Sequence, residues 1–358
     1  MSRQGERAYV YAKACGVIGK SFVGSHIAGL EAAKRLTDLD RLVFPQSFRE
    51  LPEKELLADL ERRIVNNSVH QILAIVNSFA HPPEFLVRLL RSYEYGDIKA
   101  ALSAVAGREA GKPSFTNLGR FGVVNFDAYP DIAAMIRGTE FESLVSQSIK
   151  DGEPGMILQT KLDKYYYTAL WESLYRLKRQ DREGIELILG EEISLRNAVW
   201  ALRLRTYYHL PGDEVREKLI DLEFPSPKHG GRNNHSANGH STNSHSMTGR
   251  SLTADAEASL KLPLDTYAPW ASWKRAAFLN PPAGDTWRAD PLHFQNAASR
   301  HLYHLAQRYF HRRPFSLDTA ACLIKLKQFE EDLLTSLAEG LGIGMTSRDV
   351  FAMLEVEP

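Results

Sequence analysis

The sequence predicts an all-α fold, and three observations support this prediction. Apolar side chains recur at spacings of three and four residues through most of the 358-residue chain, and this spacing places them on one face of a helix. No convincing run alternates apolar and polar residues, as a half-buried strand would. Proline and glycine pairs interrupt the apolar runs where helices would have to end.

The first two long helical runs lie between prolines. The run that starts at Glu53 follows Pro52, which a first helical turn tolerates because the missing N–H would be unpaired there. Its apolar stripe consists of Leu57, Leu60, Ile64, Ile72, Ile75 and Phe79. The pair Pro82-Pro83 must end this helix, and a second run extends from Phe85 to Val105.

The middle and the end of the chain give four more helices. A stripe from Leu158 to Leu177 indicates a helix of roughly 20 residues, ~30 Å long. A second run extends from Ile185 to Tyr208, before Pro211-Gly212. Asp290-Pro291 predicts an N-cap followed by a first-turn proline, and a last helical run follows Ser316.

These helices suggest three copies of one cassette, in which a short helix precedes two long ones. The second long helices align by polarity over residues 95–102, 195–202 and 329–337. We therefore expect helical repeats at 1–112, 113–224 and 261–358. The intervening 225–260 is rich in Ser, Asn, Gly and His, and it is expected to be a flexible insertion because it has too little apolar surface to offset the entropy of ordering.

Composition excludes several classes of protein. The 44 basic and 44 acidic side chains cancel, so the electrostatic footprint of a nucleic-acid binder is missing. Cys15 and Cys322 make no disulfide framework, and this favours a reducing cytoplasm. No secretory signal is expected at the N-terminus. The longest apolar stretch, Val69–Ala80, has about twelve residues against the roughly twenty of a bilayer span.

Two glycine motifs resemble nucleotide-binding loops only in part. Gly16-Val17-Ile18-Gly19-Lys20-Ser21 ends like a phosphate-binding loop, but Ala14 stands at the first glycine position and the preceding residues are predicted to be helical rather than a strand. The segment Gly340–Gly344 is interpreted as a helix C-terminus, where glycine adopts the left-handed conformation. We therefore expect no catalytic residues and no cofactor.

Other candidate sites have a chemical and a structural interpretation. His229, His235, His240 and His245 could hold Zn²⁺ or Ni²⁺, as in an enzyme with a metal in a flexible loop, but we interpret them as low complexity without a metal site. The acidic runs Glu191-Glu192 and Glu330–Asp332 are interpreted as solvated faces rather than acid/base pairs. The aromatic residues favour core packing, with a protein contact surface beside Arg196, Arg203 and Arg205 as the alternative.

Several segments resemble, in order and spacing, the C-type stalk protein of prokaryotic V/A-type ATPases, which is the counterpart of the d-type stalk protein of eukaryotic vacuolar ATPases. They are Tyr9–Ala14, Leu36–Phe44, Tyr93–Ala100, Asp163–Tyr166, Glu192–Asn197 with Leu202-Arg203, and Phe329–Leu333 with Gly340–Gly342. The resemblance spans nearly the whole chain. The His-rich insertion lies outside the pattern of the family.

The resemblance implies a non-catalytic central-stalk subunit of a rotary ATPase that transports protons or sodium. It implies a funnel of three helical domains on the cytoplasmic face of the membrane, bound to the central shaft subunits and the membrane ring, with membrane contact only through the complex. If the second long helices line one cavity, the candidate shaft-interface residues are Lys99, Arg196, Asn197, Arg203 and Glu331. These residues could instead pair with their own neighbours. The alternative function is a generic helical repeat scaffold for another cytoplasmic protein.

Overall fold

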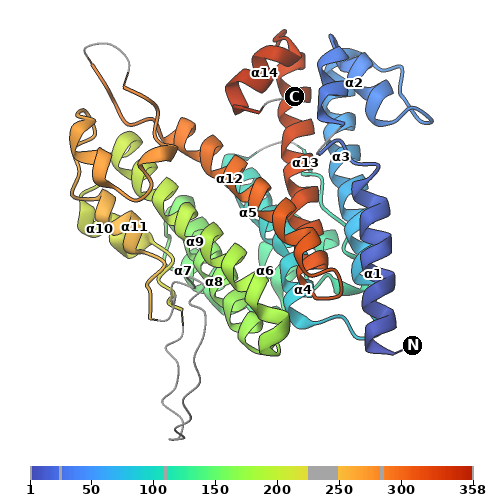
Figure 1. Cartoon of the computed structure of the whole chain (residues 1–358), viewed down its shortest axis with the longest axis horizontal. Coiled ribbons are helices and arrows are strands. Elements are labelled where there is room, and N and C mark those ends of the chain that lie inside the picture. The colour runs from blue at the N-terminus through green and yellow to red at the C-terminus, as the bar shows by residue number, and fades with distance from the viewer. Residues whose placement is uncertain (1, 24–25, 109–110, 225–248, 283–285, 357–358) are drawn as a thin grey trace, which may run out of the picture. The chain divides into compact units, whose positions relative to one another are not determined.

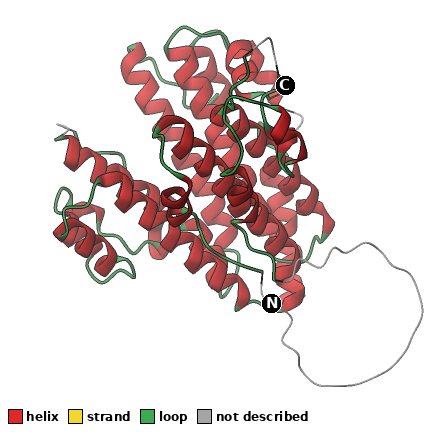
Figure 2. Cartoon of the chain, turned by 90° about the vertical axis from the view of Figure 1, so that its left-hand side faces the viewer, coloured by secondary structure: helices red, strands yellow, loops and turns green. Residues whose placement is uncertain are grey.

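The computed structural model describes residues 2–23, 26–108, 111–224, 249–282 and 286–356. Of the residues that the structure describes, 69% are helical and none lies in a strand (Figure 2). The β-like pairing in them is a single bridge between Glu223 and Ser251. The predicted fold class, all-α, is confirmed, whereas the three repeats and their arrangement as a funnel stay predictions.

The chain divides into two compact units. Unit 1 comprises Met1–Ile188 and Asn296–Pro358, and unit 2 comprises Leu189–Gln295. The helices α9 (Arg179–Tyr207) and α12 (Pro291–Arg312) each continue from one unit into the other. Asp290 caps α12 as predicted, because its carboxylate accepts a 2.8 Å hydrogen bond from the backbone N–H of Leu292.

Unit 1 is built around two long helices that pack along each other, α3 (Glu53–Val76) and α13 (Asp318–Gly342) (Figure 1). The predicted stripe of α3 is buried at Leu60, Ile64 and Ile72. The other α-helices of this unit are α1 (Arg3–Ile18), α2 (Leu36–Val43), α4 (Glu84–Leu90), α5 (Ser92–Gly107), α6 (Ile132–Ile136), α7 (Glu142–Lys150), α8 (Gly155–Tyr175) and α14 (Ser347–Leu354).

The single helix predicted from Phe85 to Val105 is divided into α4 and α5 at Arg91. The hydroxyl of Ser92 donates a 2.8 Å hydrogen bond to the carbonyl of Leu89, and a serine bonded in this way competes with the helical backbone pattern. The Arg91 guanidinium donates to the carbonyl of Phe121, which fixes the break against the loop after α5.

Both glycine motifs lie at helix ends. Tyr9–Ala14 lies within α1, as predicted, and Gly19 is its C-cap. At the end of α13, Gly344 has the left-handed φ of +86° that the sequence suggested, but Gly340 has a different role. A Cβ at Gly340 would overlap Val350 of α14. Gly340 therefore allows α14 to pack closely on α13.

Unit 2 contains the second half of α9, α10 (Gly212–Lys218) and α11 (Ala254–Ser259). The small apolar cluster of this unit consists of Ala201, Val215, Leu219 and Ala256. Short 3-10 helices span Ala268–Ser272 and Ala276–Phe278 in unit 2, and Ile27–Ala32, Gly119–Phe121 and Phe126–Ala128 in unit 1. Aromatic rings complete the packing of unit 2, with the Trp273 and Phe294 rings stacked at 5.5 Å.

The predicted flexible insertion, 225–260, is too long at its C-terminal end. Residues 225–248, with the four histidines, lie outside the described residues, but 249–260 is packed into unit 2. Leu252 and Ala256 are buried, and the backbone N–H of Leu252 donates to the carbonyl of Leu222. The few apolar side chains of residues 249–260 are thus enough to hold this stretch in place, because charged partners satisfy its polar side chains.

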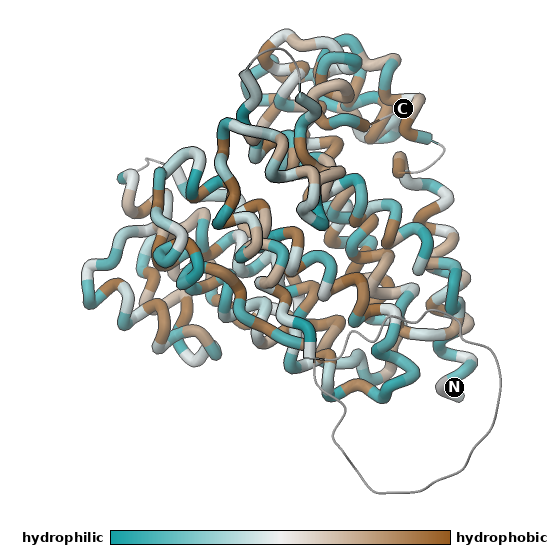
Figure 3. The backbone as a smooth tube through the Cα atoms, turned by 60° about the vertical axis from the view of Figure 1, so that its left-hand side comes forward, coloured by the Kyte–Doolittle hydropathy of each residue, from teal (hydrophilic) through white to brown (hydrophobic). Residues whose placement is uncertain are grey.

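None of the described helices is long and apolar enough to cross a membrane. Figure 3 shows hydrophobic and hydrophilic residues interleaved along the helices. This interleaving is the pattern of helices that bury one face and expose the other.

Candidate functional site

Two of the predicted interface residues, Lys99 and Glu331, connect helices within unit 1. The ammonium of Lys99 on α5 forms an ion pair with Asp163 on α8. Glu331 on α13 accepts a 2.8 Å hydrogen bond from the hydroxyl of Tyr93 on α5. Burial raises the pKa of Glu331 to about 7. The structure therefore gives both side chains partners within the unit.

The acidic run 330–332 was predicted to be a solvated face, and this prediction is wrong for its first residue. Glu330 is buried, and its carboxylate accepts a 2.6 Å hydrogen bond from the backbone N–H of Phe22. The buried ammonium of Lys327 pairs with the same carboxylate. Desolvation lowers the pKa of Lys327 to about 8. This buried pair connects α13 to the segment that follows α1.

Asn197 is fully buried, and its amide is used inside unit 2. Its Nδ2 donates to the carbonyls of Ile220 (2.9 Å) and Leu252 (3.1 Å), and its Oδ1 accepts from the backbone N–H of Ile220 (2.8 Å). The side chain thus adds to the backbone pairing of these two segments, in which the Leu252 N–H donates to the Leu222 carbonyl. It does not reach the surface in this structure, so we do not keep Asn197 among the interface candidates.

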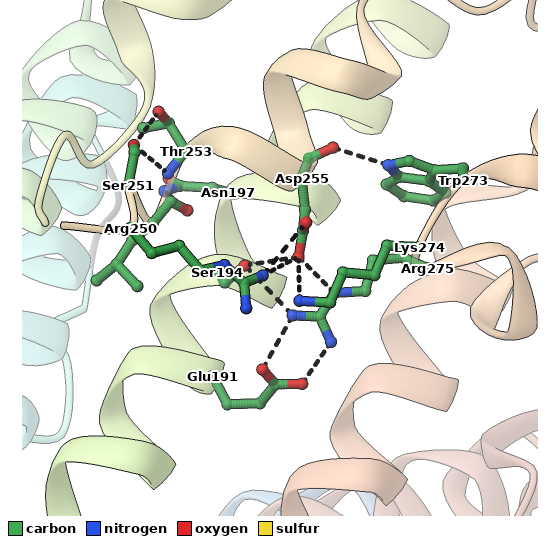
Figure 4. Close-up of polar contacts among 11 residues, drawn as sticks. Glu191, Ser194, Asn197, Arg250, Ser251, Thr253, Asp255, Trp273, Lys274 and Arg275 are labelled. Carbon is green, nitrogen blue, oxygen red and sulfur yellow. Dashed lines mark hydrogen bonds and ion pairs between the residues drawn. The ribbon is translucent and has the colours of Figure 1, made fainter. Parts of the chain in front are cut away.

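The run Glu191-Glu192 also departs from the solvated face that was predicted. Glu192 is buried, and Glu191 belongs to a charged cluster around Asp255 of α11 (Figure 4). The Arg275 guanidinium forms a two-pronged pair with Glu191 and donates from Nε to Asp255 at 2.7 Å. Arg250 and Lys274 lie 3.3 and 3.6 Å from the same carboxylate.

Polar groups complete the cluster around Asp255. Ser194 donates to the Asp255 carboxylate, and the Trp273 indole N–H donates a 2.9 Å hydrogen bond to the Asp255 carbonyl. Burial by itself would raise the pKa of Asp255, but the charges of Arg275, Lys274 and Arg250 hold that pKa below its ordinary value. The cluster is therefore ionised near neutral pH, and it ties α9, α11 and the 270–275 segment together.

Arg205 has a similar structural role at the end of α11. Its guanidinium donates 2.7 Å hydrogen bonds to the carbonyls of Ser259 and Leu262. Burial lowers the pKa of Arg205. These bonds fasten α9 to the last residue of α11 and to the turn that follows it.

Arg196 and Arg203 lie on a different face of α9. Because each residue of a helix advances by about 100°, Arg196, Trp200, Arg203 and Tyr207 fall within an arc of about 60°. Tyr207 is 55% exposed, Arg203 is exposed, and Arg196 and Trp200 are half-buried. We call these four residues the α9 stripe. For Trp200 and Tyr207, the aromatic members of the stripe, the sequence had already suggested a protein contact surface as the alternative to core packing.

The described residues contain no group of three or more His, Cys, Asp or Glu side chains that could hold a metal ion. The polar side chains described above instead connect helices to one another.

The family match identifies the chain further. The model of the ATP synthase (C/AC39) subunit family matches residues 46–229, just over half of the chain, so the chain belongs to this family. Its members are non-catalytic stalk subunits of V/A-type rotary ATPases. The resemblance found in the sequence is thus confirmed.

A full-length relative also matches. It is an uncharacterized protein of Treponema pallidum (strain Nichols), 26% identical over 339 residues, which cover 94% of this chain and 92% of that protein. The similarity therefore extends beyond 46–229 on both sides.

Proposed function

We propose that the chain couples the rotating central shaft of a V/A-type ATPase to the membrane ring, from the cytoplasmic side, during proton or sodium transport. Membership in the family supports a place in the ATPase complex. Long helices packed on one another also suit a part that transmits torque, because protein interiors are packed as densely as organic crystals.

We also propose that the three predicted ranges, 1–112, 113–224 and 261–358, form a funnel of three similar domains. The helix lengths support this division. Each range includes a pair of substantial helices: α3 and α5 with 24 and 16 residues, α8 and α9 with 21 and 29, and α12 and α13 with 22 and 25.

The observation that carries the shaft-contact proposal is the exposure of Arg203 in line with Tyr207. Arg203 forms no ion pair with any part of the chain that the structure describes. Arginine, tryptophan and tyrosine are the residue types most favoured at the centres of protein interfaces. We therefore propose that the α9 stripe contacts a shaft helix that presents carboxylates.

Lys99 and Glu331 remain candidate contacts with the shaft only if their interactions within unit 1 open. The Lys99–Asp163 ion pair and the Tyr93–Glu331 hydrogen bond would have to open before either side chain could bind the shaft. Replacement of these residues should therefore change stability as well as binding, whereas replacement of Arg203 should change binding alone.

The experiment compares Arg203→Glu with Arg216→Glu in binding to the purified central shaft subunits. Arg216 is a matched control, because it lies in the same unit and makes an exposed pair with Asp213 that is worth at most about 1 kcal/mol. We expect the Arg203 variant to fold normally and to bind about tenfold more weakly at low salt, with a smaller difference at high salt.

Two results would count against the proposal in different ways. If the unaltered chain did not bind the shaft subunits, the coupling function would be wrong. If both variants bound as tightly as the unaltered chain at every salt concentration, only the assignment of the α9 stripe would be wrong.

A further inference from the structure

We propose that one end of unit 1 is a docking surface for the phosphate headgroups of an anionic lipid bilayer. Two interhelical turns form this end, 176–180 between α8 and α9 and 308–315 at the α12–α13 junction. Together they carry six cations and no acidic residue. We call this surface the basic end; its cations are Arg176, Lys178, Arg179, Arg308, Arg312 and Arg313.

Contacts within unit 1 hold the two turns together. Arg313 forms an ion pair of 3.3 Å with Glu183 on α9. Arg7 on α1 pairs with Asp181 at 2.6 Å and also donates to the carbonyl of Phe315. The N-terminal part of α9 and the α12–α13 turn therefore lie side by side, toward the end of unit 1 where Figure 1 places the N-terminus.

Part of the charge of the basic end is not neutralised. Arg176 pairs with Glu84, and Arg179 and Arg313 share Glu183. Lys178, Arg308 and Arg312 are exposed, and they make no ion pair with the residues described. The surface therefore keeps an excess of positive charge on a chain whose net charge is zero.

Lys178 and Arg179 occupy a position that disfavours cations, and of the two, Arg179 is compensated by its ion pair with Glu183. They lie at the N-terminus of α9, where the helix dipole already contributes partial positive charge. Arg308 and Arg312 at the C-terminal end of α12 are explained by the dipole of that helix, but the two cations of α9 are not. An anion such as phosphate is stabilised at this kind of helix end.

Two further features favour a bilayer over an acidic protein. An open depression of about 510 Å³ at the start of α9 is lined by Lys178, Arg179, Gln180 and Glu183, and it is too open to enclose a side chain of a protein partner. The ring of Phe315 is 57% exposed beside Arg312 and Arg313. Aromatic rings next to cations are typical of segments that rest in the headgroup region.

The test is sedimentation of the full chain with lipid vesicles. One set contains phosphatidylcholine alone, and the other contains phosphatidylcholine with phosphatidylglycerol. We expect binding to the acidic vesicles that weakens with added salt, and little binding to the neutral ones. The variants Lys178→Glu and Arg312→Glu should each weaken binding by more than about fivefold, since the loss of one cation at an anionic surface alone costs about that factor and the new carboxylate adds repulsion.

Arg348→Glu is the matched control, because Arg348 is exposed on α14, outside both turns. It should bind acidic vesicles as the unaltered chain does, and Lys178→Gln and Arg312→Gln should show intermediate losses. Equal binding to neutral vesicles, no binding to acidic vesicles, or an equal loss in the control would overturn the proposal. Complete displacement by inorganic phosphate, but not by chloride of equal ionic strength, would overturn it by indicating an ion site. The test uses no other ATPase subunit, so its result is independent of the shaft proposal.

Discussion

The carboxylate of Asp318 lies directly against the backbone of Gly184, where a Cβ atom would have no room. Asp318 is the first residue of α13, Gly184 lies in the second turn of α9, and both are buried. The close approach of these two helices in unit 1 thus depends on a glycine at one position and on the protonation state of a buried carboxyl at the other.

Replacement of Gly184 by alanine should destabilise the protein. Alanine favours a helix by up to about 1 kcal/mol over glycine, but the added methyl group would overpack against a fully buried carboxylate, at a cost of about 1–3 kcal/mol. We expect a net loss in the urea midpoint. Gly96 on α5 is the control, because no atom lies within 4 Å of the position of its missing Cβ. Gly96→Ala should raise the midpoint, and equal effects of the two variants would contradict the overpacking explanation.

Asp318 should make stability depend on pH. Burial raises the pKa of Asp318 from its ordinary value of 3.8 to about 6, although the charge of Arg313 opposes the rise. Because the folded pKa is the higher one, the folded state binds more protons between these values. The contribution of Asp318 to the free energy of unfolding is therefore complete below pH 3.8. It is lost as the pH rises through about 6, and the total loss is up to about 3 kcal/mol. Asp318→Asn should remove this part of the slope of unfolding free energy between pH 4 and pH 7, and an unchanged slope would show that the carboxyl does not titrate there.

Arg275→Ala should destabilise unit 2 by about 3–5 kcal/mol, because it leaves the buried Asp255 without its closest cation. Arg275→Lys should recover only part of the loss, since lysine does not reproduce the two-pronged pair with Glu191. Tryptophan fluorescence measures the effect, because four of the five tryptophans, Trp200, Trp270, Trp273 and Trp287, belong to unit 2. Arg216→Ala, which breaks an exposed pair, should change the midpoint little.

Two deletions should differ sharply in stability. Removal of residues 228–246 should change the melting temperature by less than about 5 °C, because closure entropy depends only weakly on loop length. Removal of 228–250 should cost more, since it also deletes Arg250, which pairs with Asp255, and the Phe224–Arg250 backbone hydrogen bond. Equal melting temperatures for the two proteins would show that the Arg250 contacts contribute little to stability.

The fold class could be predicted from the sequence because each long helix has an apolar stripe with the helical period. The start of α3 at Glu53 and the N-cap at Asp290 followed from local rules about proline and capping. The break at Arg91 could not be predicted, because it depends on hydrogen bonds with Leu89 and with the distant Phe121.

The polar candidates show a similar limit. A polar residue on a helix can face solvent or a buried partner, and the spacing does not distinguish the two. Asn197 and Glu330 are buried because their partners, Ile220 and Leu252 for Asn197 and the segment after α1 for Glu330, lie elsewhere in the chain. Arg203, by contrast, is exposed. The sequence identified these positions as polar, but only the tertiary contacts separate a structural role from an interface role.

The close packing of Gly340 against Val350 has an evolutionary consequence. A methyl group at position 340 would meet the branched Val350 side chain, so the two positions should vary together among relatives. A relative with alanine or serine at the position of Gly340 should carry a residue smaller than valine opposite it, or should lack α14 altogether. The pair thus gives a simple criterion for deciding which distant homologues keep the C-terminal helix in the same place.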